Sequence, residues 1–529
     1  MPFEKSTHWI PVPAKGRNRR IVCIPFQCAK VLRNLITMAI RRIRPSWIIG
    51  GLFGLTFVVL LTLRLDILQQ GKADHKVEGI NNDQIQWDRE TWMNIFQKDQ
   101  KIGYAHRQFS HSAQGFKVLE SVFMQINTMG MMQEIRFRTE GNLHPDLTLS
   151  SFDFELQSSL FRFKAQGVLK DQLLSILAGT PGSEQKVDLP IKKDANLSVG
   201  VLEALVNKDL KSGETRTFNV FDPVAMAERP VKVSVLGEET ISIMGRQEKA
   251  VKVSVDFMGA PQFAWIGKDR TVLREEGSFG IRLEQVTREE ALQKVALLPD
   301  ADITEITSIR ANKTLDDVDG IKELNVKLEG IEEGILFLNG GRQSFKDKVL
   351  MIRKEVVSSL LSQKPGEGTF QEGKSYLEGD PFIQSDHPEI KAKMREIVLP
   401  DDPALVKAKK LVSWVYQNIQ KRPVLSVPNA LETLHNRVGD CNEHAVLLTA
   451  LARAAGIPAQ VEAGLVYQKG RFYYHAWNVL YLGDWITADS VRGQLPSDVT
   501  HIRFVRGNER QIDLIGIIGK VKLEILSTS

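Results

Sequence analysis

The chain has 529 residues, of which 43% are hydrophobic and 25% charged, with three cysteines and a formal net charge of +5. This composition excludes an intrinsically disordered chain, a fibrous protein and a disulfide scaffold, and a mean hydropathy of −0.17 excludes a polytopic membrane protein. The length allows about three to four domains. The near-neutral charge balance does not favour a polyanionic partner, so we expect no nucleic acid binding.

The positive charge is concentrated in residues 1–46, a basic segment that we predict to be cytoplasmic. This segment holds ten Lys and Arg against one acid, for a local charge of +9, whereas the remaining residues carry −4. The uncharged run WIIGGLFGLTFVVLLTL follows directly after Arg41, Arg42 and Arg44. A basic segment before an apolar run of this length predicts a transmembrane helix over residues 47–64 with a cytoplasmic amino terminus.

The apolar run is interpreted as an uncleaved signal anchor, because no pair of small residues follows it where a peptidase would cut. The protein would then be a single-pass protein of the inner (cytoplasmic) membrane that contacts the lipid bilayer through residues 47–64. The rest of the chain would be periplasmic or extracellular. A buried core helix and a translation start at Met38 are the alternative interpretations.

Residues 75–300 alternate between apolar and polar side chains, as in FKVLESVFMQI and KAVKVSVDF. This pattern predicts an antiparallel β domain, an up-and-down curved sheet or open barrel of about 200 residues. Its histidines are scattered and no metal-binding or phosphate-binding spacing occurs, so we expect no chemistry there. Residues 301–385 continue with shorter strand-like pieces, ITEITSI and ELNVKLEGI, as a β-rich connecting region. The middle of the chain either presents a substrate or partner, or serves as a spacer.

Helical periodicity begins the last segment, residues 386–529, with KAKKLVSWVYQNI and then GDCNEHAVLLTALARAAGIP. In the second stretch Asp440 can cap a helix, with Glu443 three residues later to complete a capping box, and Gly456 ends it. Cys441 therefore lies in the first helical turn. The free N–H groups and the helix dipole at this position favour a thiolate.

The cysteine distribution points to the same residue. Cys23 and Cys28 precede the predicted span, so Cys441 is the only cysteine in the part expected to be exported. A lone thiol in an oxidising compartment is either buried as a small apolar side chain or used chemically.

The stretch GRFYYHAWNVLYLGDWITADS predicts two antiparallel strands, Phe472–Leu482 and a second strand from Trp485. If residues 482–484 form a three-residue loop, His475 lies opposite position 491, and Asp489 is its diagonal neighbour on the same face, within reach of a hydrogen bond. A two-residue turn would place the two side chains on opposite faces. The alternative interpretations are a histidine packed in an aromatic cluster and a turn residue at a strand end.

A thiol at a helix start, a histidine and an acid together form the Cys-His-Asp arrangement used for acyl transfer. With these motifs, residues from about 388 to 504 resemble the transglutaminase-like superfamily of papain-type fold, as found in bacterial membrane-anchored members. The resemblance implies that Cys441 is the nucleophile, His475 the general base and Asp489 the orienting acid. Family members usually carry Pro-Thr after the acid, whereas this chain has Ser490-Val491.

Three further residues are candidates for roles at this site. His444, one turn after Cys441, competes with His475 as the base but is interpreted as a surface or supporting residue. The Cys441 N–H is the expected first donor to an oxyanion, and Trp414 and Gln417 are candidates for the second.

The fold class predicted from these observations is α+β, with an N-terminal transmembrane helix, an antiparallel β-rich middle domain and a C-terminal transglutaminase-like domain. The expected function is that of a membrane-anchored extracytoplasmic cysteine enzyme, which acts on peptide or carboxamide bonds through a thioester, foremost as a protease or amidase. Its partner would be a protein or peptide substrate, such as a cell-wall peptide. A protein cross-linking transglutaminase and a non-catalytic peptide-binding module remain alternatives. No cofactor or metal is expected, and calcium dependence has no support because no calcium-binding loop occurs.

Overall fold

The computed structural model describes residues 88–529, apart from residues 160, 183, 207–210, 258, 296–301, 332–333, 335 and 358–375. These residues all belong to one compact unit, Ile85–Ser529. Of the residues described, 50% lie in strands and 19% in helices.

A single sheet of fifteen strands occupies the first part of the described chain, in the order β8-β7-β6-β5-β4-β3-β2-β1-β15-β14-β13-β12-β11-β10-β9. Neighbours in this order are mostly neighbours in sequence, so the sheet consists of two antiparallel meanders, β1–β8 and β10–β15, joined where β1 pairs with β15. The short strand β9 is added at one edge, parallel to β10. The strands are β1 Arg89–Gln97, β2 Gln100–Ser112, β3 Gly115–Thr128, β4 Met131–Leu143, β5 Leu149–Ser158, β6 Arg162–Lys170, β7 Leu173–Gly179, β8 Gln185–Pro190, β9 Ala195–Leu197, β10 Thr215–Asp222, β11 Ala227–Ile243, β12 Arg246–Phe257, β13 Ala260–Gly267, β14 Val272–Glu276 and β15 Ile281–Val286.

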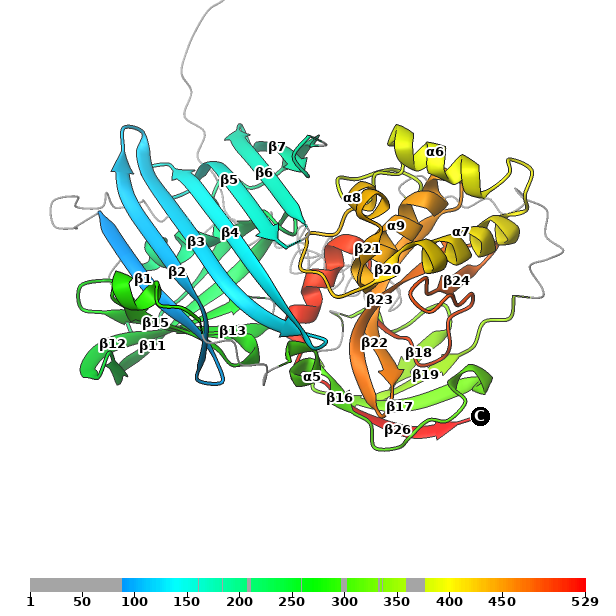
Figure 1. The fold of residues 1–529 in the computed structure, drawn as a ribbon. Coiled ribbons are helices and arrows are strands. Elements are labelled where there is room, and N and C mark those ends of the chain that lie inside the picture. Colours follow the sequence, from blue (N-terminus) through cyan, green and yellow to red (C-terminus); the bar gives the residue numbers. More distant parts are fainter. Residues whose placement is uncertain are drawn as a thin grey trace, which may run out of the picture. The chain divides into compact units, whose positions relative to one another are not determined.

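The sheet curls so that strands far apart in its order share one apolar core, as Figure 1 shows for β1–β4 and β11–β13. Met93 of β1 and Val122 of β3 belong to the same buried cluster as Val233 of β11. Helix α3 (Ser198–Val206) contributes Leu205 to this cluster. The alternation of buried and partly exposed residues along each strand explains why the sequence pattern predicted antiparallel strands here.

The second part of the described chain packs helices on a sheet in which β16, β23, β22 and β25 are neighbours and β24 pairs with β23. Helix α9 lies between α6, α7 and α8 on one side and β22 and β23 on the other, and its residues 443–452 are all buried. The helices are α4 Arg288–Ala291, α5 Ile303–Thr307, α6 Pro388–Ile397, α7 Ala404–Asn418, α8 Ala430–Asn436 and α9 Cys441–Ala454, with the 3-10 turns η2 Ser278–Gly280, η3 Val318–Gly320 and η5 Asn508–Gly516. The strands are β16 Ile309–Arg310, β17 Glu323–Glu329, β18 Gln343–Lys346, β19 Val349–Arg353, β20 Gln420–Lys421, β21 Val438–Gly439, β22 Ala459–Gln468, β23 Arg471–Tyr481, β24 Trp485–Ala488, β25 Ile502–Arg506 and β26 Lys522–Thr528.

The predicted connecting region is tied to the end of the chain. Strands β17, β18 and β19 form a four-stranded sheet with β26, the last strand. The stretch ITEITSI was predicted to be a strand, but it contains helix α5. The carboxylate of Asp302 caps this helix by accepting a hydrogen bond from the Thr304 N–H at 2.8 Å, and this local cap outweighs the strand preference of Ile and Thr.

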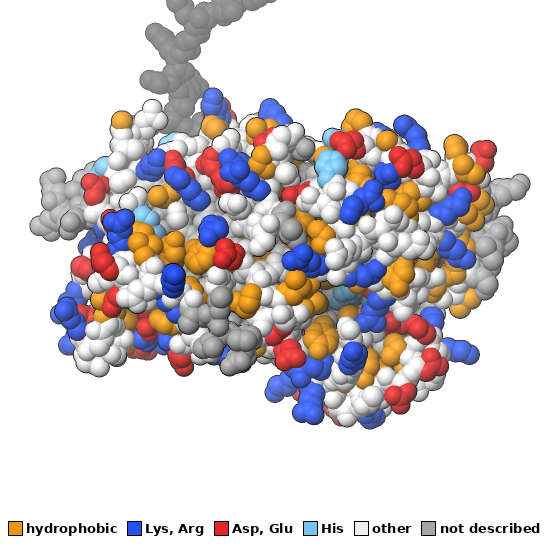
Figure 2. Space-filling view, viewed as in Figure 1, with side chains coloured by type: hydrophobic (Ala, Val, Ile, Leu, Met, Phe, Trp, Pro, Cys, Tyr) orange, Lys and Arg blue, Asp and Glu red, His pale blue; other side chains and the backbone are white. Residues whose placement is uncertain are grey.

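Charges of both signs are mixed on the face of the molecule drawn in Figure 2. Within the described chain, charged side chains also pair across neighbouring strands, as Lys117 does with Glu140 at 2.6 Å and Lys252 with Glu239 at 3.1 Å. Such exposed pairs keep a surface soluble in water and contribute little to stability.

The predicted fold class and the predicted location were wrong. The described chain is dominated by strands, and none of its helices is long and apolar enough to cross a membrane. The longest of them, α7, has 15 residues, which span about 22 Å against a hydrocarbon core of about 30 Å. The predicted single-pass inner-membrane location, with its periplasmic catalytic domain, is therefore wrong. The predicted bilayer contact through residues 47–64 stays a prediction. Residues 1–46 and 47–64, on which the topology prediction was based, lie outside the described residues. The predicted domain boundaries remain predictions.

Candidate active site

Cys441 is the first residue of α9, where the predicted capping box is present. The Asp440 carboxylate accepts a hydrogen bond from the Asn442 N–H at 2.8 Å, and the Glu443 carboxylate accepts one from the Asp440 N–H, also at 2.8 Å. Cys441 is a free thiol and is partly exposed. The cap thus fixes the start of the helix directly beside the sulfur.

The surroundings of Cys441 favour a thiol over a thiolate at rest. Burial raises the pKa of Cys441 well above its ordinary value, and the charge of Asp440 raises it further. A hydrogen bond from the Ala476 N–H to the sulfur acts in the opposite direction. The thiolate preference expected from the helix dipole is therefore outweighed by desolvation.

His475 and Asp489 are brought together by the hairpin of β23 and β24. Asn478 lies opposite Ala488, which is the register that a loop over residues 482–484 predicted. Asp489 follows β24 directly, and His475 Nε2 lies 2.9 Å from Asp489 Oδ2. Because the carboxylate accepts this hydrogen bond, Nε2 carries the proton and Nδ1 is left as the basic nitrogen.

The turn after β24 holds Asp489 as an ionised acceptor. Its Oδ1 accepts hydrogen bonds from the Val491 N–H at 2.7 Å and the Arg492 N–H at 3.2 Å. Burial alone would raise the pKa of Asp489, but the charge of His475 and the hydrogen bonds from His475 and His501 hold it well below its ordinary value. Ser490-Val491 in place of Pro-Thr thus leaves the acid firmly positioned.

A polar contact fastens the strand of His475 to the helix of Cys441. The Asn478 amide on β23 donates to the Ala445 carbonyl and to Thr449 Oγ1 on α9, both at 2.8 Å. Together with the hydrogen bond from the Ala476 N–H to the Cys441 sulfur, this contact places Cys441 beside the residue that follows His475.

Residues 391–490, which include Cys441, His475 and Asp489, match the family model described as the transglutaminase-like superfamily. The chain contains a transglutaminase-like superfamily domain.

Other comparisons are more distant. No curated protein matches the chain. A β-barrel-like protein of a domain of unknown function from Brucella abortus is 13% identical, with a TM-score of 0.31 over 38% of this chain and 97% of its own. A candidate cysteine protease from Cytophaga hutchinsonii is 16% identical, with a TM-score of 0.26 over 40% of this chain and 85% of its own. These two similarities are too weak to carry an argument.

His444, the competing base, is fully buried in the transglutaminase-like domain. Its Nδ1–H donates to the Asp440 carbonyl on the same helix at 2.6 Å, and within the described residues Nε2 has no partner. Burial lowers the pKa of His444. It is therefore a weaker candidate for the base than His475, whose ring is oriented by the Asp489 carboxylate.

The two candidates for the second oxyanion donor make contacts elsewhere. The Trp414 ring lies under the Arg437 guanidinium at 4.6 Å, and the exposed Gln417 donates to Ser413 one turn earlier on α7. Neither contact involves Cys441, so the second donor is still unassigned.

His501 is a member of the site that the sequence reasoning missed. Its Nε2 lies 2.9 Å from Asp489 Oδ2, the same oxygen that His475 contacts. His501 reaches this position on a separate segment, just before β25, so neither the helix cap nor the hairpin could predict it. The available signal was the pair Asp498 and His501 at a spacing of three in SDVTHIRF.

The side-chain atoms of His475, Asp489 and His501 lie within 4.8 Å of one another. Each histidine already donates its Nε2–H to Asp489, and Arg492 Nε lies 3.8 Å from the same carboxylate oxygen. The Nε2 atoms of both histidines therefore carry protons directed at the carboxylate and cannot also bind a metal ion. A metal ion would in addition have to bind beside the positively charged Arg492 guanidinium. We therefore assign no metal ligands here.

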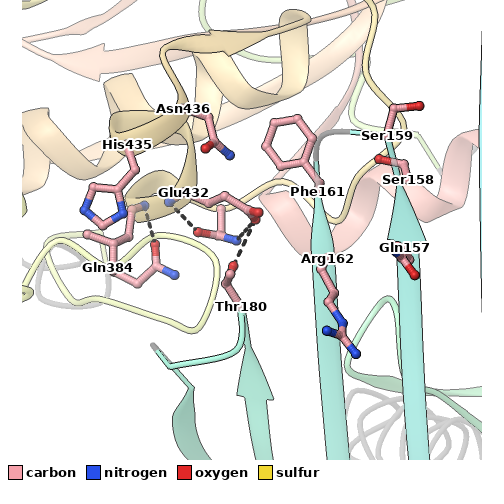
Figure 3. A pocket seen from close by; sticks show the side chains of 12 residues that line it. Gln157, Ser158, Ser159, Phe161, Arg162, Thr180, Gln384, Glu432, His435 and Asn436 are labelled. Atoms are coloured by element: carbon pink, nitrogen blue, oxygen red, sulfur yellow. Dashed lines mark hydrogen bonds between the residues drawn. The ribbon is translucent and has the colours of Figure 1, made fainter.

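A separate cavity of about 370 Å³ lies beside α8 (Figure 3). Side chains of α8 line it together with residues at the ends of β5, β6 and β7. The buried Glu432 accepts hydrogen bonds there from Thr180 Oγ1 and the Asn429 amide, both at 3.0 Å. None of Cys441, His475 and Asp489 lines this cavity, although α8 leads through β21 to Cys441.

Proposed function

We propose that the transglutaminase-like domain is a cysteine-dependent acyl-transfer enzyme that acts on peptide or carboxamide bonds, foremost as a protease or amidase. The observation that carries the proposal is the hydrogen bond from His475 Nε2–H to the ionised Asp489. This hydrogen bond leaves Nδ1 of His475 as the base. The next residue, Ala476, contacts the Cys441 sulfur through its N–H.

In the proposed reaction, His475 Nδ1 takes the Cys441 proton while the sulfur attacks the carbonyl carbon. The tetrahedral intermediate collapses when the C–N bond breaks and the His475 proton passes to the leaving amine, which leaves a thioester. Water, deprotonated by His475, then attacks the thioester and releases a carboxylic acid with recovery of the thiol. Asp489 stabilises the imidazolium form of His475 in both halves of the reaction.

Because Cys441 is partly exposed, water, which is in large excess over any amine, can reach the thioester, and this favours hydrolysis. Attack by a primary amine would instead form a new amide, the reaction of a cross-linking transglutaminase. The raised pKa of Cys441 favours the remaining alternative, a non-catalytic peptide-binding module, because a resting thiol is a poor nucleophile.

Mass spectrometry of a peptide library incubated with the full chain, with and without methylamine, separates these outcomes. Cleavage, deamidation and amine incorporation give three different mass changes, and all of them should be absent with Cys441→Ala. Products that persist in Cys441→Ala would refute the proposed nucleophile. An unchanged library combined with peptide binding would establish the non-catalytic alternative.

A further inference from the structure

The Asp489 carboxylate is shared by two histidines. His475 Nε2 and His501 Nε2 each lie 2.9 Å from Asp489 Oδ2. His501 is completely buried, and its ring packs edge-on against Trp477 with 5.2 Å between centroids. Because both histidines donate to one carboxylate oxygen, His501 affects how strongly Asp489 can stabilise the charged form of His475.

Both ring nitrogens of His501 face oxygen atoms that can only accept. Nε2 faces Asp489 Oδ2, and Nδ1 lies 3.3 Å from both the carboxylate Oδ1 and the carbonyl oxygen of Asp498. A neutral imidazole has one N–H and would turn a lone pair toward one of these carboxylates. Only the imidazolium form donates on both sides. Burial opposes this charge, but the hydrogen bonds to Asp489 and Asp498 raise the pKa of His501 above its ordinary value.

Charges within this cluster compensate one another. Arg492 lies 3.8 Å from Asp489 and 3.4 Å from Asp498. Two cations, Arg492 and His501, thus contact two carboxylates, Asp489 and Asp498, next to His475. The Arg342 guanidinium holds the turn by donating to the Asp498 and His501 carbonyls at 3.0 and 2.9 Å. The other charged or titratable groups around the cluster are Asp319, Glu355, Lys421, His444 and His475.

A carboxylate that already pairs with a cation stabilises a second cation less strongly. The imidazolium form of His475 therefore gains less from Asp489 than it would from an unshared carboxylate. We propose that His501 is a positioning residue that, as a buried cation sharing Asp489, keeps the Cys441–His475 couple uncharged at rest. This inference rests on the proposed role of His475 as the base of Cys441.

The test is the rate at which iodoacetamide alkylates Cys441 in the full chain at pH 7. His501→Gln keeps an N–H donor toward Asp489 and removes the charge, so alkylation should become roughly tenfold faster. The gain should disappear in the double variant His501→Gln, His475→Ala, because the thiolate then lacks its proton acceptor. His435→Gln makes the same chemical change at a half-exposed histidine and should leave the rate unchanged.

A role in packing alone predicts that His501→Gln reacts no faster than the wild type, and this result in a folded variant would overturn the inference. If His501→Gln does not fold, Asp498→Asn removes one of the two carboxylates that hold the charge and should also accelerate alkylation. Failure to accelerate would again refute the proposal. Acceleration that persists without His475 would refute His475 as the base and leave the charge of His501 standing.

Discussion

Two buried carboxylates in the transglutaminase-like domain differ in the cations that surround them. Glu462 on β22 is 1% exposed and accepts hydrogen bonds from Arg503, Arg506 and the Trp477 indole at 3.3, 2.8 and 3.0 Å. Burial would raise the pKa of Glu462, but the charges of Arg503 and Arg506 hold it below its ordinary value.

Asp489, equally buried, accepts hydrogen bonds from His475 and His501 instead, and Arg492 lies farther away, at 3.8 Å. Arginine stays charged at any pH the protein meets, whereas histidine exchanges its proton near neutrality. The ion pairs of Glu462 therefore have a structural role, whereas the groups that contact Asp489 can gain and lose protons. Trp477 touches both groups, since it donates to Glu462 and packs on His501. The two acids are equally buried, so the type of cation that contacts each one distinguishes the proposed catalytic acid, Asp489, from the structural acid, Glu462.

The largest effect is expected for Asp489→Asn. The amide carries no charge to stabilise the imidazolium form of His475 and can turn its NH2 group toward Nε2, which favours the wrong tautomer, so turnover of a library substrate should fall by about 10⁴. Steady-state kinetics on folded protein, with the fold checked by circular dichroism, measure this. A loss below about tenfold would mean that Asp489 does not orient the base.

Glu462→Gln should act on stability instead. Two buried guanidinium groups lose their counter-charge, so the free energy of unfolding should fall by about 3–5 kcal/mol, measured by urea denaturation. Turnover per folded molecule should change little. A variant of normal stability with lost turnover would reverse the roles assigned to the two acids.

Gly464→Ala should disturb the pairing of β22, the strand of Glu462, with β25, the strand that follows His501. A Cβ at this position would lie 2.0 Å from the Ile502 carbonyl oxygen, next to His501. The strands must separate, and we expect a loss of about 1–3 kcal/mol in thermal or urea unfolding. Gly277→Ala, where a Cβ meets nothing within 4 Å, is the matched control, and equal losses in both variants would contradict this explanation.

The smallest effect concerns pH. The pKa of His501 is raised on folding, so its contribution to stability is fully present below the unfolded value of about 6.5 and is lost as the pH rises through the folded value. The difference in Tm between wild type and His501→Gln should therefore shrink from pH 6 toward alkaline pH. A difference that grows with pH would show that His501 is buried in its neutral form.

Local patterns predicted much of the site. The capping box places Cys441, and the hairpin loop sets the register that brings Asp489 to His475. Both depend on residues close together in sequence. His501 comes from a third segment, positioned by packing and by Arg342. No periodic pattern along the chain predicts its contact with Asp489.

Where local preference competed with the environment, the environment prevailed. The helix dipole favoured a thiolate at Cys441, but burial raises its pKa. The Ile and Thr residues of ITEITSI favoured a strand, but the Asp302 cap starts a helix. Alternation along the chain predicted the large antiparallel sheet well, because one face of each strand is buried.

The central claim, that Cys441 carries the acyl group, is tested most directly by mass spectrometry of the acyl-enzyme. The full chain is mixed with p-nitrophenyl acetate, quenched in acid at short times and digested. The account predicts an acetyl group on the Cys441 peptide that forms in a burst and decays in water, and that is strongly reduced in His475→Ala. Acetylation spread over lysines, with an unmodified Cys441 and the same nitrophenol release from Cys441→Ala, would contradict it.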